Sequence, residues 1–204
     1  MRNLIFTLPF IFLSATFAGE ATDQIKNTTA QLRKLLEDPT MMGDEKKRER
    51  RRAIREIADS SFDWKDIVRR SLARSWSKLN SEQQDELVKL FVEFLEVSYL
   101  EKLEIHYSDL KEVNYKKERL IGKKYAMVLC EIVTKKGTSH PVEFRLKTSE
   151  NRWKAYDMKI EGVSMVKNYR SQFADIMKTS GYAGLILTLS QRIEDAKKLK
   201  ASGS

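Results

Sequence analysis

The segment Val142-Glu143-Phe144-Arg145-Leu146-Lys147 alternates apolar and charged residues at every position. Alternation with a period of two is typical of a β-strand that packs one face on a core and turns the other to water. Further strands are predicted over 125–134 and 153–160, and a short alternating piece begins at Val113. Because only short polar turns separate these strands, the sequence predicts an antiparallel meander of about four strands.

On both sides of the strands the apolar residues follow a helical period instead. The expected helices cover 25–38, 44–59, 63–72, a longest helix from Asn80 or Ser81 to about 103, then 163–180 and 185–196. The order of helices, strands and helices predicts an α+β fold, with helices packed on one face of a curved sheet.

The first 18 residues have the composition of a secretory signal peptide. Arg2 supplies a positive start, Leu4 to Leu13 is apolar, and Ala18 offers a small residue for cleavage. The apolar run is too short to span a bilayer, which takes roughly 20 residues. We therefore expect cleavage after Ala18 and export to the periplasm. Residues 19–204 are expected to form one domain with a basic tail that frays from about Lys197.

The chain has 38 basic and 29 acidic residues, and its formal net charge is +9. A basic surface suits nucleic acid, anionic lipid or an acidic partner, and export argues against nucleic acid. From Lys46 to Arg55 seven of the ten residues are basic. This stretch is either a solvated helix face or a patch for anionic lipid headgroups or an acidic protein.

The residue types that carry catalysis and metal binding are sparse. Cys130 is the single cysteine, and it lies in an apolar strand pattern that predicts a buried, inert thiol. His106 and His140 are far apart, so we predict no metal site. Asp157 is the one candidate general base, but its place on a strand favours a structural or outward-facing role.

The predicted sheet has an apolar inner face that either packs as a core or lines a cavity. Its members are Val128, Cys130, Ile132, Val142, Phe144, Leu146, Tyr156, Met158 and Ile160. Since no convergent set of polar residues accompanies them, a cavity here would suit an apolar ligand.

Several segments together resemble one protein family. The most specific is Glu161 to Phe173, which reads EGVSMVKNYRSQF. The others are Trp153 to Met158, Glu131 to Gly137, Pro141 to Leu146, Phe62 to Trp64 and Ser71 to Trp76. They are similar to the MlaC family, also called the toluene-tolerance auxiliary family, whose members are periplasmic phospholipid-binding components of an ABC-type lipid transport system. Ala73 departs from the pattern, because the family usually has glycine there.

The resemblance implies an NTF2-like fold whose apolar cavity takes acyl chains and leaves the headgroup in water. It implies no catalytic residues and no cofactor, with phospholipid as cargo. The implied partners are an inner-membrane ABC-type transporter complex with an MCE-domain protein and an outer-membrane lipoprotein complex. From strand alternation and helix faces, the expected acyl contacts are Tyr99, Leu103, Val128, Val142, Phe144, Leu146, Tyr156, Met158, Val166, Tyr169 and Phe173.

Two other functions stay open on the residues alone. An NTF2-like enzyme acting on a small apolar substrate would need a buried acid or base, for which Asp157 is the candidate. A non-enzymatic interaction module would instead present an exposed apolar patch to a partner protein.

Overall fold

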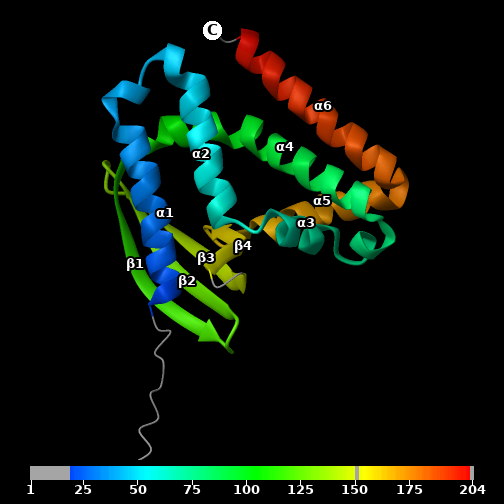
Figure 1. The fold of residues 1–204 in the computed structure, drawn as a ribbon, viewed down its shortest axis with the longest axis horizontal. Helices are drawn as coiled ribbons and strands as arrows, with labels where there is room; N and C mark the ends of the chain where they lie inside the picture. Colours follow the sequence, from blue (N-terminus) through cyan, green and yellow to red (C-terminus); the bar gives the residue numbers. More distant parts are fainter. Residues whose placement is uncertain (1–18, 150–151, 203–204) are drawn as a thin grey trace, which may run out of the picture.

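A computed structural model describes residues 19–149 and 152–202 (Figure 1). The expected signal peptide, residues 1–18, lies outside the described residues. The helices are α1 (Glu20–Glu37), α2 (Lys47–Ser61), α3 (Trp64–Leu72), α4 (Ser81–Tyr107), α5 (Met165–Thr179) and α6 (Gly181–Ser202). Short 3-10 turns occupy Pro39–Met41, Asp44–Lys46 and Ala73–Lys78. No helix in the described part of the chain is long and apolar enough to cross a membrane.

The strands form one antiparallel sheet in the order β1-β2-β3-β4-β5, which confirms the predicted α+β fold. They are β1 (Leu110–Ile121), β2 (Tyr125–Thr134), β3 (Ser139–Ser149), β4 (Arg152–Ile160) and β5 (Val163–Ser164). Strand β5 was missed, because two residues carry no periodicity. Strand β1 is longer than the predicted piece, because the charged run 116–119 hides the alternation of this edge strand.

Polar side chains set the starts of three helices, and two of these starts, at Asp63 and Asn80, are the predicted ones. Asp63 accepts a hydrogen bond from the Asp66 N–H at 2.9 Å and caps α3. Asn80 and Gln83 exchange bonds of 2.9 and 3.0 Å in a capping box at the start of α4. Ser164 caps α5. Such caps satisfy N–H groups that have no partner inside the helix, so local sequence suffices to place these boundaries.

Buried apolar side chains form two main clusters rather than one. The sheet cluster joins α1 to strands β2–β4 and consists of Ala21, Ile25, Ala126, Val128, Cys130, Leu146, Trp153 and Ala155. The bundle cluster joins α3, α4, α5 and α6 and consists of Ile67, Val68, Leu72, Leu79, Leu87, Phe91, Phe94, Val166, Tyr169, Phe173, Leu185, Leu189 and Ile193. In Figure 1, α1 lies over the sheet while α3 to α6 pack together beside it.

A few contacts around the start of α3 connect the two regions. Phe62 packs against both clusters, and the Asp63 N–H donates to the Ala155 carbonyl on β4 at 2.9 Å. Lys147 on β3 places its Nζ 3.0 Å from Oδ2 of both Asp63 and Asp66. The buried Asp66 therefore pairs with a strand residue as well as with residues of its own helix.

One helix terminus differs from expectation, and another is followed by an unusual backbone conformation. Helix α6 continues to Ser202, so the tail expected to fray from about Lys197 is helical, and Lys197 pairs with Glu93 at 3.1 Å. At the end of α3, Ala73 has φ 48° and ψ −120°, a conformation that favours glycine. This backbone geometry gives a physical reason for glycine at the corresponding position of the family pattern.

Candidate functional site

The inner face of the sheet is set by the pairing of β2 with β3. Cys130 lies opposite Val142, Val128 opposite Phe144, and Ala126 opposite Leu146. Val128, Val142 and Leu146 are fully buried, whereas Phe144 is half-buried. Since Ala21 and Ile25 of α1 pack against this face, the residues of β2 and β3 occupy the positions that alternation predicts.

Strand β4 contains a β-bulge that changes which residues reach the inner face. Phe144 pairs with Met158, Arg145 with Asp157, and Leu146 with Ala155, so Tyr156 is the extra residue. Two residues of a bulged strand lie opposite one residue of the partner, and simple alternation is lost. No pattern in the strand sequence announces this bulge, which depends on the partner strand.

The bulge places Tyr156 on the outer face, so its predicted position on the inner face is wrong. Its ring lies 4.0 Å from the Arg70 guanidinium carbon and meets Tyr125 edge to face, with 5.8 Å between the ring centroids. Trp153 and Ala155 occupy the inner face in its place, and sequence alternation missed both. Met158 and Ile160 follow the bulge and face inward, opposite Phe144 and Val142.

At the β3–β4 end of the inner face, apolar side chains stay accessible. Phe144 and Met158 are half-buried, Ile160 is 47% exposed, and Val163 of β5 is 65% exposed. A contiguous exposed apolar surface is typical of a ligand or partner site. We call Phe144, Met158, Ile160 and Val163 the open end.

The predicted contacts on the helices fall into a different environment. On α4, Tyr99 is 49% exposed and Leu103 is 38% exposed. The Tyr99 and Tyr169 hydroxyls lie 3.3 Å apart, and burial together with this hydrogen bond raises the pKa of Tyr169. Val166, Tyr169 and Phe173 belong to the bundle cluster rather than to the inner face of the sheet.

Asp157 is buried and all its contacts are structural. Its Oδ1 accepts hydrogen bonds from the backbone N–H groups of Met158 and Val166 at 2.9 and 3.1 Å, and its Oδ2 accepts one from the Ser164 hydroxyl at 2.7 Å. The carboxylate thus ties the first turn of α5 to β4. The structural role predicted for Asp157 is confirmed, and its carboxylate is buried although it lies on the outer face of the sheet, opposite Arg145.

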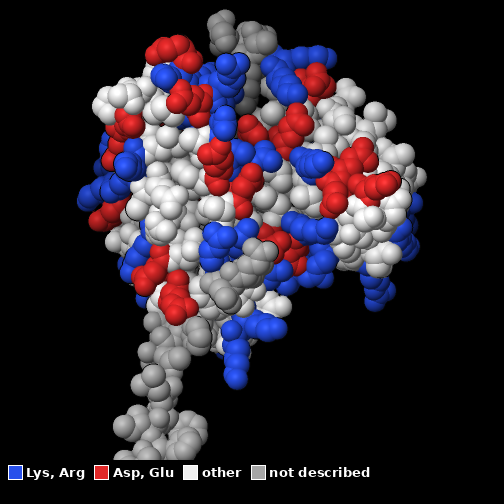
Figure 2. Space-filling model, in the orientation of Figure 1, with Lys and Arg blue, Asp and Glu red and all other residues white. Residues whose placement is uncertain are grey.

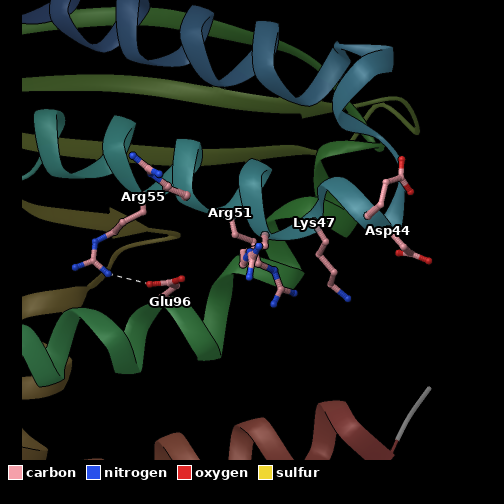
Figure 3. Close-up of a pocket in the computed structure, with 8 residues that line it drawn as sticks. Asp44, Lys47, Arg51, Arg55 and Glu96 are labelled. Carbon is pink, nitrogen blue, oxygen red and sulfur yellow. Dashed lines mark hydrogen bonds and ion pairs between the residues drawn. The ribbon is translucent and has the colours of Figure 1, made fainter.

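The basic stretch 46–55 lies at the start of α2, beside a cleft of about 720 Å³ between α2 and α4 (Figure 3). Arg50 pairs with Glu104 at 2.7 Å, and Arg55 pairs with Glu96 at 2.8 Å. Figure 2 shows cationic and anionic side chains interleaved over the surface in view. Much of the stretch is therefore a helix face whose basic side chains form ion pairs with nearby carboxylates.

The described residues include no group of three or more His, Cys, Asp or Glu that could hold a metal ion. Cys130 is buried, and burial raises the pKa of its thiol to about 11. A thiol in this environment stays protonated at neutral pH and behaves as a small apolar residue.

Comparison with known proteins identifies the chain. The fold is similar to that of a phospholipid-binding protein from Ralstonia solanacearum in complex with a phospholipid, with a TM-score of 0.77 and 24% sequence identity. The similarity covers 87% of this chain and 99% of that one. No curated protein matches the sequence. The family model described as MlaC protein matches residues 26–191, and the chain therefore belongs to the MlaC family.

Proposed function

We propose that this protein is a periplasmic carrier that binds a phospholipid by its acyl chains. It would exchange the lipid with an inner-membrane ABC-type transporter complex containing an MCE-domain protein and with an outer-membrane lipoprotein complex. Membership of the MlaC family supports this proposal, as does a similar fold in a protein solved with a phospholipid. The observation that carries it is the open end, where apolar side chains of the sheet remain accessible.

The physical argument rests on the transfer of acyl chains out of water. Each buried CH₂ contributes about 0.8 kcal/mol, so one long chain contributes on the order of 10 kcal/mol. The open end supplies apolar partners for such a chain, and Val142 extends them inward along the same face. A carrier needs this shield because a lipid monomer is poorly soluble in an aqueous compartment.

The proposed acyl contacts are the predicted residues that this geometry makes available. The accessible ones are Tyr99, Leu103, Phe144 and Met158, and the deeper ones are Val128, Val142, Leu146, Val166, Tyr169 and Phe173. Among the strand residues of the predicted set, Tyr156 is the one that the inner face of the sheet does not present. A binding role is favoured over an enzymatic one, because both oxygens of Asp157 already accept hydrogen bonds within the fold.

The test is lipid analysis of protein purified from the periplasm of a bacterial host that expresses the full chain. We expect co-purified phospholipid in native mass spectrometry and in solvent extracts. Ile160→Lys should lower the bound lipid about tenfold, because it adds a charge to an apolar site. Leu187→Lys is the matched control, since Leu187 is also exposed and apolar but lies on α6.

Two results would contradict the proposal. Protein that is consistently empty would favour an interaction module that uses the open end to dock a partner. Equal lipid content in the Ile160→Lys and Leu187→Lys variants would exclude the open end as the lipid site. Exchange of labelled phospholipid between donor and acceptor vesicles then tests the carrier step, which should accelerate with the wild type and not with Ile160→Lys.

A further inference from the structure

The space between α2 and α4 holds more positive than negative charge. Two carboxylates of α4 face three guanidinium groups of α2. Arg55 Nη1 lies 2.8 Å from Glu96 Oε2, and Arg50 Nε lies 2.7 Å from Glu104 Oε1. Arg51 Nε is 3.8 Å from Glu104 Oε2, which is beyond hydrogen-bond distance. Of these three guanidinium groups, that of Arg51 therefore lies farthest from its carboxylate.

The Arg51 guanidinium has donors that nothing in the described residues satisfies. Its Nε and Nη2 are buried and have no hydrogen-bond partner there, while the side chain as a whole is 25% exposed. An arginine presents five N–H donors in a planar fork, and leaving buried donors unpaired destabilises a protein. Figure 3 shows Arg51 and Lys47 extending from α2 into the space beside α4. The arrangement calls for an acceptor in the cleft.

Neighbouring cations add to the positive electrostatic potential around Arg51. Lys47 and Arg48 also line the cleft, and neither forms an ion pair among the residues that the structure describes. Two further acidic residues line it, Asp44 and Glu45, but the Glu45 carboxylate lies directly over Gly43. In all, five cationic and three anionic side chains line the cleft, which leaves a positive surplus.

We propose that this cleft binds a phosphate group, with Arg51 as the central donor and Arg48 and Lys47 as flanking charges. The guanidinium fork matches two oxygens of a phosphate, and the lysine ammonium supplies a point charge. A small anion fits better than an acidic protein surface, because the Arg51 side chain is only 25% exposed and three acidic side chains also line the cleft. The phosphate belongs either to a glycerophospholipid headgroup or to a soluble phosphate, and the site does not depend on acyl binding.

The test is isothermal titration calorimetry, in which the purified protein, expressed as the full chain, is titrated with inorganic phosphate and with glycerol 3-phosphate. We expect binding that weakens as salt is added, because charge pairs are screened. Arg51→Gln should weaken binding about tenfold or more, since it removes charge-assisted hydrogen bonds. Arg119→Gln is the matched control, because it makes the same charge change at an exposed position on β1. Retained binding in Arg51→Gln would overturn the proposal.

An experiment with lipid vesicles distinguishes the two sources of phosphate, a lipid headgroup and a soluble phosphate. Co-flotation with phosphatidylglycerol vesicles that Arg51→Gln abolishes would assign the site to a lipid headgroup, and binding of soluble phosphates alone would assign it to a free phosphate. Both results support the site. Binding of an acidic peptide in place of any phosphate would overturn it.

A stability measurement separates binding from a structural role of Arg51. In phosphate-free buffer Arg51→Gln should leave the melting temperature unchanged or raise it, because the lost donors have no partner. A clear fall would show that Arg51 holds α2 to α4 and would contradict the proposal. The exposed Arg48→Gln variant should weaken phosphate binding in either case. Lipid content of the Ile160→Lys variant reports on the acyl site alone, so the two proposals can fail independently.

Discussion

The sheet cluster and the bundle cluster are both buried, but they are filled in different ways. The sheet cluster includes four small side chains, which let α1 pack closely on the strands: Ala21, Ala126, Cys130 and Ala155. In the bundle cluster, aromatic rings occupy the space. The Phe91 ring meets Tyr169 at 4.9 Å and Phe173 at 5.7 Å, both edge to face.

The different packing of the two regions suggests that the bundle mainly stabilises the fold and that the open end of the sheet mainly binds lipid. Large interlocked rings at close packing make the bundle sensitive to any loss of volume. Helix α1 packs on the sheet cluster, whereas the open end of the sheet keeps apolar residues accessible. We therefore expect a substitution at Phe91 in the bundle to act mainly on the free energy of unfolding, and substitutions at the open end to act mainly on lipid content.

The largest effect should come from Phe91→Ala in the bundle cluster. We expect a loss of about 4 kcal/mol in the free energy of unfolding, because the fully buried ring leaves a cavity. Val128→Ala in the sheet cluster is the comparison and should cost about 1 to 2 kcal/mol. Urea denaturation measures both. Equal losses would erase the distinction between the two clusters.

Asp66→Asn should break the connection between the regions at a cost of about 3 kcal/mol, because it leaves Lys147 and two arginines with a neutral partner. Burial raises the pKa of Asp66, but hydrogen bonds from Arg70, Lys147 and Arg69 outweigh it and hold the pKa below its usual value. The contribution of ionised Asp66 to the free energy of unfolding is therefore complete above about pH 4. It is lost as the pH falls through the pKa of Asp66 in the folded protein, which is lower than in the unfolded chain.

Denaturation at pH 7 and at pH 3 checks this prediction. The wild type should lose stability between these values, and Asp66→Asn should lose less. Asp85→Asn is the control, because Asp85 forms an exposed pair with Lys65, and it should change stability by about 0.5 kcal/mol or less. A pH dependence that Asp66→Asn leaves intact would count against this carboxylate as its source.

Asp157→Asn should cost about 1 to 2 kcal/mol, because an amide cannot accept all three hydrogen bonds that join β4 to α5. Lipid content should stay at the wild-type level, because Asp157 lies on the outer face of the bulge. Thermal denaturation and lipid extraction on the same sample check both statements. Loss of lipid from a stably folded variant would place Asp157 in the binding site.

The smallest effect should come from Ala73→Gly, which we expect to stabilise the protein by about 1 kcal/mol. The positive φ of Ala73 strains a residue with a Cβ, and glycine relieves that strain. Ala53→Gly inside α2 is the matched control and should destabilise by about 1 kcal/mol. A shift of the same sign in both variants, measured by calorimetry, would contradict the strain at Ala73.

Much of the local structure was predictable because its determinants lie within a few residues. Strand β2 spans the predicted Tyr125 to Thr134, and the capping residues Asp63 and Asn80 start α3 and α4 as expected. The family was also predictable, since several segments together resemble it, and Glu161 to Phe173 is the most specific of them. The acyl contacts were harder to predict from the sequence, because the expected residues divide between the bundle cluster and the sheet cluster, and this division depends on tertiary packing.

The sequence by itself determined the order of the elements, the alternation of Val142, Phe144 and Leu146, and the family. Hydrogen bonds and side-chain periodicity within one segment are enough for these features. Only the tertiary structure decided that the bulge turns Tyr156 outward, that the bundle and the sheet pack separately, and that Arg51 Nε and Nη2 have no hydrogen-bond partner among the described residues. Each depends on a partner from another strand or helix, and the pattern of a single segment does not specify which partner it meets.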